Sequence, residues 1–357
     1  MNSYTPLSFQ DKQNSTSGKV AWQSPSNIAL VKYWGKYGRQ LPRNTSISFT
    51  LKNAHTDMKM SYVPKKGDVA QVILYFEEER NTAFEARIAK FIASIDDIYP
   101  FLQELDLEIY SSNSFPHSAG IASSASAMSA LACCLCSIER EIFDTLKNED
   151  EFLKKASYIS RLASGSAARS VYPTLAVWGE HPDIDGSSNE YAIPVKTAPI
   201  FDTFRNSILI ASSEEKSVSS TAGHNLMNEN PYAAVRFTQA NDNLSKLYKA
   251  MQDGDIDTFI EIVELEALTL HALMMTSTPS YVLMCPSSLS MIEKIRAFRK
   301  TTGLSLCFTL DAGPNIHLLY PQSIAGEVQI FVQNELKPLC ENGLIIEDEV
   351  GKGAFAL

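Results

Sequence analysis

Residues 116–127 read PHSAGIASSASA, a run of small and hydroxylated residues around Gly120. An apolar segment, residues 127–136, follows directly, and we expect it to continue as a buried helix. Small side chains let backbone N–H groups approach an anion, serine hydroxyls add donors, and a helix N-terminus favours negative charge. The pattern is therefore typical of a phosphate-binding loop, although a serine- and alanine-rich helix start without a ligand has the same composition.

Length and composition limit the class of protein. The chain has 357 residues, which is long for one compact core and favours two domains. Hydrophobic residues make up 45% and charged residues 20%, as in an ordinary globular protein. The formal net charge of −10 argues against nucleic acid as a partner, because nucleic-acid binding needs a basic face. A few local lysines and arginines can still attract an anionic small molecule to one cleft.

Neither a targeting segment nor a membrane span is expected. Residues 1–18 are polar and lack the features of a signal or transit peptide, so we predict a flexible N-terminus and a cytoplasmic protein. No apolar run reaches the roughly 18–20 residues of a membrane helix, so no membrane partner is expected. Cys133, Cys134 and Cys136 share one predicted helix at offsets that cannot converge on a metal, which favours buried free thiols and no resident metal site.

Strands and helices mix along the whole chain, which predicts an α+β sandwich. We place the first domain at residues 19–203 and the second at 204–357. A short strand at 20–22 is expected to end in a turn at residues 24–27, because Pro and Asn favour turns. Further strands are predicted at 47–51, 56–63, 69–76, 107–110, 175–178, 191–195, 207–211, 304–310 and 316–320. Further helices are predicted at 81–95, 149–163, 231–252, 256–275, 287–302 and 325–339.

Two lysines stand four residues apart near the N-terminus. Lys32 and Lys36 flank Tyr33 and Trp34, an arrangement that suits an anionic ligand with an apolar body. An amphipathic strand with solvated lysines would look the same.

Two further segments carry polar groups on turns. Ser164, Ser166 and Arg169 could hold a carboxylate or phosphate, or could form a helix C-cap followed by a surface arginine. Asp311 follows an apolar strand, where it could accept a proton from a substrate hydroxyl or simply cap a turn. The histidines are scattered, and the sequence has neither a Walker-A motif nor a G-x-G-x-x-G motif.

Taken together, these segments resemble the GHMP kinase superfamily and, within it, the diphosphomevalonate decarboxylases, from about residue 20 to residue 320. The Lys-Tyr-Trp-Gly-Lys run and the Asp-Ala-Gly-Pro-Asn run are typical of the decarboxylases rather than of kinases with the same fold. The resemblance implies an N-terminal domain like domain 2 of ribosomal protein S5 and a ferredoxin-like C-terminal sandwich. The matching segments, in family order, are 27–36, 120–125, 164–169, 218–221 and 311–315.

The resemblance also implies a reaction and roles for residues. ATP with Mg²⁺ would phosphorylate the C3 hydroxyl of mevalonate diphosphate, and phosphate and CO₂ would then leave to give isopentenyl diphosphate. Asp311 would orient or deprotonate the hydroxyl, and Arg169 with Asn27 would hold the C1 carboxylate, with Lys32 as the fourth catalytic residue. The implied substrate contacts are Tyr33, Lys36, Arg80, Ser164, Ser166 and Ser220. The implied ATP contacts are Ser118, Gly120, Ala122, Ser123 and Ser124. Family members are often homodimers.

Some positions depart from the family pattern. Ala168 stands where cysteine is usual, Pro173-Thr174 replaces a Gly-Gly pair, and His117-Ser118 replaces Thr-Ala. None removes a charged catalytic group, but they leave open whether a diphosphate or a monophosphate is preferred. The alternatives are a mevalonate 3-kinase, a phosphomevalonate decarboxylase, and an inactive small-molecule-binding homologue. The presence of both Asp311 and Arg169 argues against a simple kinase, which has no need to hold a departing carboxylate.

Overall fold

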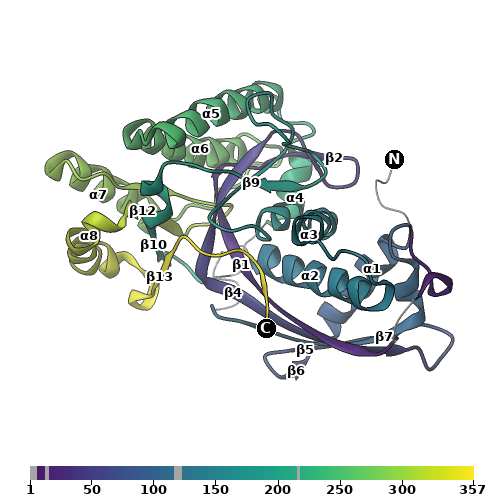
Figure 1. The fold of residues 1–357 in the computed structure, drawn as a ribbon. Helices are drawn as coiled ribbons and strands as arrows, with labels where there is room; N and C mark the ends of the chain where they lie inside the picture. Colours follow the sequence, from purple (N-terminus) through teal and green to yellow (C-terminus); the bar gives the residue numbers. More distant parts are fainter. Residues whose placement is uncertain (1–5, 13–15, 116–122, 215–217) are drawn as a thin grey trace.

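The structure is a computed structural model that describes residues 6–12, 16–115, 123–214 and 218–357. Helices pack on two main sheets, and helix α6 (Ile256–Met275) contacts both. The mixed α+β architecture predicted from the sequence is therefore confirmed (Figure 1). Among the described residues, none of the helices is long and apolar enough to cross a membrane.

The larger sheet is built on two long antiparallel strands, β1 (Gly18–Val31) and β4 (Ser46–Pro64), which cross the molecule in Figure 1. The turn predicted at residues 24–27 is wrong, because β1 runs straight through it with a register shift between Pro25 and Asn27. Pro25 has no N–H for the ladder, and an irregular pairing tolerates that loss. The two strands predicted within 47–63 are likewise one strand. From β4 the sheet continues through β7 (Leu105–Asn113), β5 (Val72–Phe76) and β6 (Glu79–Arg80). A branch also leaves β4, which pairs with β8 (Leu175–Trp178), and β8 pairs with β9 (Ala192–Pro194).

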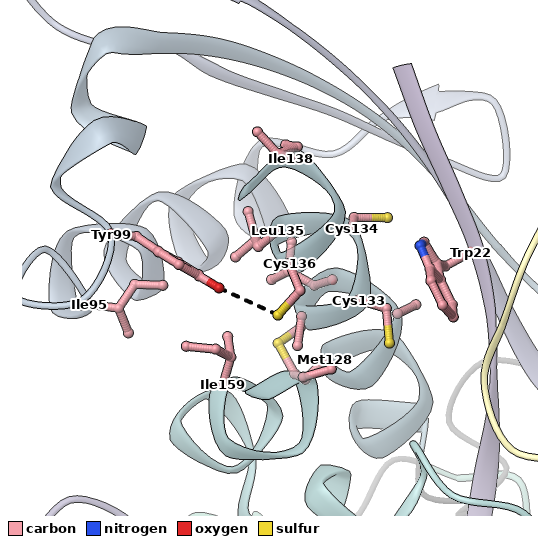
Figure 2. Close-up of a cluster of buried hydrophobic side chains, with 14 of the residues drawn as sticks. Trp22, Ile95, Tyr99, Met128, Cys133, Cys134, Leu135, Cys136, Ile138 and Ile159 are labelled. Carbon is pink, nitrogen blue, oxygen red and sulfur yellow. Dashed lines mark hydrogen bonds between the residues drawn. The ribbon is translucent and has the colours of Figure 1, made fainter. Parts of the chain in front are cut away.

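Three helices accompany this sheet: α1 (Thr82–Ser94), α2 (Ser123–Phe143) and α3 (Glu149–Ala163). As predicted, α2 is buried along most of its length, and it packs against β1, β4 and α3. Figure 2 shows Cys133, Cys134 and Cys136 inside this core, with the Cys136 sulfur 3.4 Å from the Tyr99 hydroxyl. Burial raises the pKa of the Cys136 thiol to about 12, so these are unreactive packing residues, as expected.

The smaller sheet has the order β11-β12-β10-β13 and is covered by long helices. Its strands are β10 (Phe204–Leu209), β11 (Cys307–Thr309), β12 (Ile316–Pro321) and β13 (Ile345–Glu349). A hairpin of β2 (Lys36–Tyr37) and β3 (Leu41–Pro42) pairs with neither of the two larger sheets. The helices are α4 (Ser220–Leu226), α5 (Ala233–Asp253), α6 (Ile256–Met275), α7 (Pro286–Thr302) and α8 (Ala325–Phe331). The helix predicted at 325–339 ends as a regular α-helix at Phe331 and continues as π and 3₁₀ turns, since Pro338 supplies no N–H near its end.

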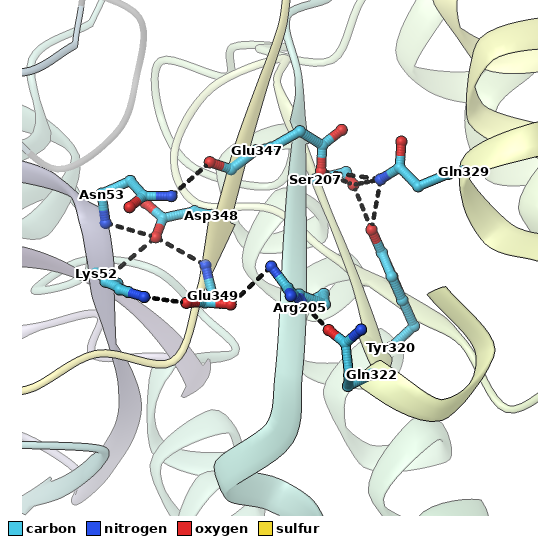
Figure 3. A network of polar contacts seen from close by, with 10 residues as sticks. All are labelled: Lys52, Asn53, Arg205, Ser207, Tyr320, Gln322, Gln329, Glu347, Asp348 and Glu349. Carbon is cyan, nitrogen blue, oxygen red and sulfur yellow. Dashed lines mark hydrogen bonds and ion pairs between the residues drawn. The ribbon is translucent and has the colours of Figure 1, made fainter. Parts of the chain in front are cut away.

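The C-terminal end of the chain ties the two sheets together. The Asp348 carboxylate accepts the backbone N–H groups of Lys52, Asn53 and Ala54 at 2.8–2.9 Å, and Glu349 forms ion pairs with Lys52 and Arg205 (Figure 3). The chain then returns to the first sheet, where β14 (Phe355–Ala356) pairs with β1. The expected second domain, 204–357, therefore gives its last strand to the sheet of the first, and the division at 203/204 stays a prediction.

Candidate active site

A cavity of about 200 Å³ lies where the end of β1 meets the start of α2, the 3₁₀ turn at Gly165–Arg169, helix α4 and the loop between β11 and β12. Elements from both halves of the chain build it, so no single sequence segment contains it. It brings together nine of the residues predicted for the site: Asn27, Lys32, Tyr33, Lys36, Ser124, Ser164, Ser166, Arg169 and Asp311.

An ion pair joins the two halves of the chain inside this cavity. The Lys32 ammonium lies 2.9 Å from a carboxylate oxygen of Asp311 and donates to the Ala29 carbonyl at 2.6 Å. The Lys32 side chain is 2% exposed and that of Asp311 29% exposed, so the carboxylate is the partner that opens to the cavity. Burial lowers the pKa of Lys32, and the neighbouring Asp311 opposes that shift.

The backbone of Lys32 is held from the second half of the chain. Its N–H donates to Glu266 at 2.9 Å, and Glu266 is paired with Arg236 at 2.5 Å, both side chains being buried. Asn44 donates its amide to the Lys32 carbonyl at 3.0 Å. A buried ion pair thus fixes the main chain at the point where β1 ends and Lys32 turns toward Asp311.

The guanidinium of Arg169 is held by hydroxyls rather than by a carboxylate. It donates to Ser48 at 2.9 Å and to Ser46 at 2.5 Å, with Asn27 at 3.4 Å. Burial lowers the pKa of Arg169 to about 10, so it remains a cation at neutral pH. A buried cation held by neutral acceptors retains its charge for an anion entering the cavity.

Serines and a tyrosine form another part of the wall. Ser124, in the first turn of α2, donates to Ser164 at 3.1 Å. The Tyr33 hydroxyl is buried without a hydrogen-bond partner in the described part of the chain, and a Cβ added at Gly165 would lie 2.9 Å from it. Lys36 donates to Gln40 at 2.8 Å, and burial lowers its pKa.

Five of the predicted residues require separate comment. Ser118, Gly120 and Ala122 lie outside the described residues. Ser220 is the first residue of α4. Ser123 lines a neighbouring cavity of about 220 Å³, which Ser124 also borders.

Arg80 does not reach the cavity. It lies on the exposed strand β6 and pairs with Glu85 at 2.7 Å. Arg87, on α1, instead lines both cavities. Nothing in the sequence marks Arg87, because it stands beside the buried Ile88 of α1 and resembles an ordinary surface arginine. Sequence reasoning also missed Gln40 and His224 in the cavity wall, whereas Trp34 and Thr221, which line it too, lie in segments matched by the resemblance.

The charge around the cavity favours an anion. Among the described residues that line it, Lys32, Lys36, Arg87 and Arg169 stand against the single carboxylate of Asp311. Within the same described ranges, no three His, Cys, Asp or Glu side chains gather as ligands for a metal ion. A cavity with surplus positive charge, built by both halves of the chain, is typical of enzymes that bind an anionic small molecule, and the fold and site favour this class.

Comparisons with known proteins agree with this class. A family model described as the diphosphomevalonate decarboxylase-like N-terminal domain matches residues 24–190, and one described as the mevalonate 5-diphosphate decarboxylase C-terminal domain matches residues 207–349. The chain belongs to the diphosphomevalonate decarboxylase family, of the GHMP superfamily, as its motifs predicted.

Individual relatives cover nearly the whole chain. Diphosphomevalonate decarboxylase ERG19 of Gibberella zeae is 30% identical over 331 residues, covering 86% of this chain and 82% of its own. The enzyme of Debaryomyces hansenii is 29% identical over 324 residues, covering 85% and 80%. The crystal structure of mevalonate diphosphate decarboxylase from Staphylococcus aureus is 26% identical, with a TM-score of 0.82 over 96% of this chain and 98% of its own. A structure described as MDDEF in complex with MVAPP, AMPPCP and magnesium shares the fold, with a TM-score of 0.82 at 22% identity over 96% and 99% of the two chains.

Proposed function

We propose that this protein catalyses the ATP-dependent decarboxylation of mevalonate 5-diphosphate to isopentenyl diphosphate, with ADP, phosphate and CO₂ as the other products. Membership of the decarboxylase family supports this reaction. The observation that carries it is the pairing of Asp311 with Lys32 in the cavity that also holds the buried cation Arg169. The reaction requires a carboxylate that accepts the proton of the substrate hydroxyl and a cation that binds the substrate carboxylate.

In the first step, the Asp311 carboxylate accepts the proton of the C3 hydroxyl as the hydroxyl oxygen attacks the γ-phosphorus of ATP. The bond from that phosphorus to the bridging oxygen breaks, and ADP leaves with the electron pair. A tertiary alcohol is a poor nucleophile, and a positioned base typically contributes about 10²–10⁴-fold. Lys32 fixes the carboxylate from one side, and the carboxylate opens to the cavity, where the C3 hydroxyl would lie. Phosphoryl transfer otherwise depends on alignment and on neutralising phosphate charge.

In the second step, the C3–O bond breaks with its electron pair going to phosphate, and positive charge develops at C3. The C1–C2 bond pair then forms the C2–C3 double bond as CO₂ departs. Once the proton has passed from Asp311 to a phosphate oxygen, the Asp311 carboxylate stabilises the positive charge, and burial strengthens that interaction. Arg169 and Asn27 orient the C1 carboxylate so that the breaking bond lies parallel to the empty orbital at C3.

The remaining polar groups suit the phosphates of the two substrates. Lys36, Tyr33, Ser164 and Ser166 face the diphosphate, and Arg87 takes the place first assigned to Arg80. ATP would occupy the neighbouring cavity, where Phe76, Phe84 and Met128 form an apolar wall for the base and Asn113 and Ser111 offer polar contacts.

The phosphates of ATP would lie at the start of α2, on Ser123 and Ser124 and the residues before them. Mg²⁺, bound with ATP, would neutralise phosphate charge during transfer. Two expectations remain predictions: a homodimer, which analytical ultracentrifugation tests, and a cytoplasmic location.

A product assay tests the proposal. Purified protein is mixed with ATP, Mg²⁺ and mevalonate 5-diphosphate, and products are followed by phosphorus NMR and CO₂ release. Isopentenyl diphosphate with equal amounts of CO₂ and ADP supports the decarboxylase. ADP with a stable 3-phosphorylated product makes the protein a 3-kinase, and turnover of the 5-monophosphate alone makes it a phosphomevalonate decarboxylase. No turnover of any mevalonate phosphate makes it an inactive binding protein.

A further inference from the structure

His224 lies in the wall of the cavity and has no part in the mechanism above. Helix α4 carries it there, and its ring packs against Tyr33 and Trp34 with centroid separations of 4.3 and 4.5 Å. The preceding residue, Gly223, lets α4 approach this closely, because a Cβ there would lie 2.5 Å from the Trp34 ring and 2.7 Å from the Tyr281 hydroxyl. Packing against these two aromatic rings therefore holds the His224 ring in place.

One hydrogen bond fixes the tautomer of this ring. The Gly35 backbone N–H donates to Nδ1 of His224 at 2.9 Å, so Nδ1 is an acceptor and the proton of the neutral ring is on Nε2. Burial, and then the charge of Lys36, lower the pKa of His224 to about 3, which keeps the ring neutral. The described part of the chain gives Nε2 no hydrogen-bond partner. A neutral N–H donor with a fixed direction is thus available at the cavity wall.

The surroundings of His224 indicate which end of the ligand it meets. Its Nδ1 accepts from the Gly35 N–H, and Gly35 immediately precedes Lys36, whereas Asp311 pairs with Lys32 and Arg169 is held by the hydroxyls of β4. The reacting end of the substrate, with its C3 hydroxyl and C1 carboxylate, belongs with Asp311 and Arg169. Lys36 and His224 therefore serve the opposite end, where the phosphates are.

We infer that the Nε2–H of His224 donates a hydrogen bond to the terminal phosphate of the diphosphate substrate and so selects a diphosphate over a monophosphate. This inference rests on the proposed function, because it uses the same substrate orientation. Lys36 attracts any anion as a point charge, whereas a fixed N–H binds only an oxygen that lies along its direction. A substrate without the terminal phosphate leaves that donor unpaired, which penalises its binding.

Two substitutions separate the ligand contact from the packing role. His224→Asn places an amide oxygen near the position of Nδ1, where it can accept the Gly35 N–H, but it has no donor at the position of Nε2. His224→Gln extends an amide N–H toward that position and gives up the Gly35 bond. Binding is measured calorimetrically without ATP, using mevalonate 5-diphosphate, mevalonate 5-phosphate and inorganic pyrophosphate as probes.

We expect His224→Asn to raise the Kd for the diphosphate by about 10-fold or more, the range of a hydrogen bond to a charged group. Its Kd for the monophosphate should change by less than about twofold, and kcat should stay near that of the wild type while KM rises. His224→Gln should bind the diphosphate within about threefold of the wild type. Equal weakening of both ligands by His224→Asn, no weakening, or a loss with Gln as large as with Asn would overturn the inference.

Two further readouts keep the test decisive. If His224→Asn does not fold, NMR of the wild type with ¹⁵N-labelled histidine decides, because the Nε2–H resonance must shift on adding the diphosphate and remain in place with the monophosphate. A wild type that binds the diphosphate but releases no CO₂ contradicts the proposed function and leaves the inference standing. A wild type that binds neither the diphosphate nor pyrophosphate overturns both.

Discussion

Replacing Asp311 by asparagine removes the base and the negative charge with almost no change in shape. The amide oxygen can still accept a hydrogen bond from the Lys32 ammonium, which lies 2.9 Å from the carboxylate in the wild type. Loss of a general base costs about 10²–10⁴-fold, which corresponds to about 3–5 kcal/mol of transition-state stabilisation. Loss of the anion that faces the developing charge at C3 adds to this. We therefore expect Asp311→Asn to lower kcat by at least about 10³-fold and to bind ATP as the wild type does.

The assay is ADP formation under saturating substrates, with ATP affinity measured separately. Glu139→Gln is the control, because Glu139 forms a more deeply buried pair with Lys155 at 2.7 Å, and neither residue lines the cavity. The control should lose stability, since breaking a buried pair costs up to about 3–5 kcal/mol, and should keep its kcat. If Asp311→Asn retains a kcat within about threefold of the wild type, the assignment of Asp311 as the base is refuted.

The remaining predictions concern binding, packing and pH. In steady-state kinetics, Arg87→Ala should raise KM for the diphosphate by about 10-fold or more, and Arg80→Ala should raise it by less than about twofold. The reverse order would support Arg80, and not Arg87, as the substrate contact. Gly165→Ala should displace Tyr33 into the cavity, because the added Cβ would lie 2.9 Å from the tyrosine hydroxyl, and should raise KM for the diphosphate by about 10-fold. An unchanged KM would show that the neighbouring side chains move aside without narrowing the cavity. His317 has its pKa lowered to about 4 by burial, so below about pH 6.5 the unfolded chain takes up a proton that the folded chain does not. Stability should fall by up to about 3 kcal/mol as the pH drops from 6.5 to 4, and urea unfolding of His317→Gln should show a shallower fall; equal pH slopes would contradict this.

Much of the fold was predictable because its helices are long and strongly patterned. The helix expected at 149–163 is α3, and those expected at 256–275 and 287–302 lie within a residue of α6 and α7. The strand errors have a common physical cause. Pro25 looks like a turn residue, but pairing with β4 along its whole length holds β1 extended, so tertiary structure overrides a local preference.

The site was predictable where its residues lie in recognisable motifs. Lys32 and Asp311 are separated by 279 positions, and their motifs placed both in one site before any contact was known. Arg87 was missed because nothing in its neighbourhood marks it, and His224 was missed because it lies just beyond the matched segment 218–221. The place of Arg87 in the cavity wall depends on the orientation of α1, and that of His224 depends on the close approach of α4 to Trp34. Such placements arise from packing between distant segments, which spacing along the chain does not encode.

The central claim is that the C3 hydroxyl oxygen is phosphorylated before it leaves. Mevalonate 5-diphosphate carrying ¹⁸O in the C3 hydroxyl tests this directly, with the released phosphate and water analysed by mass spectrometry after complete turnover with ATP and Mg²⁺. The mechanism predicts that the label appears in inorganic phosphate, because the bond from this oxygen to the γ-phosphorus forms first and the C3–O bond breaks afterwards. Label recovered in water, with unlabelled phosphate, would contradict it.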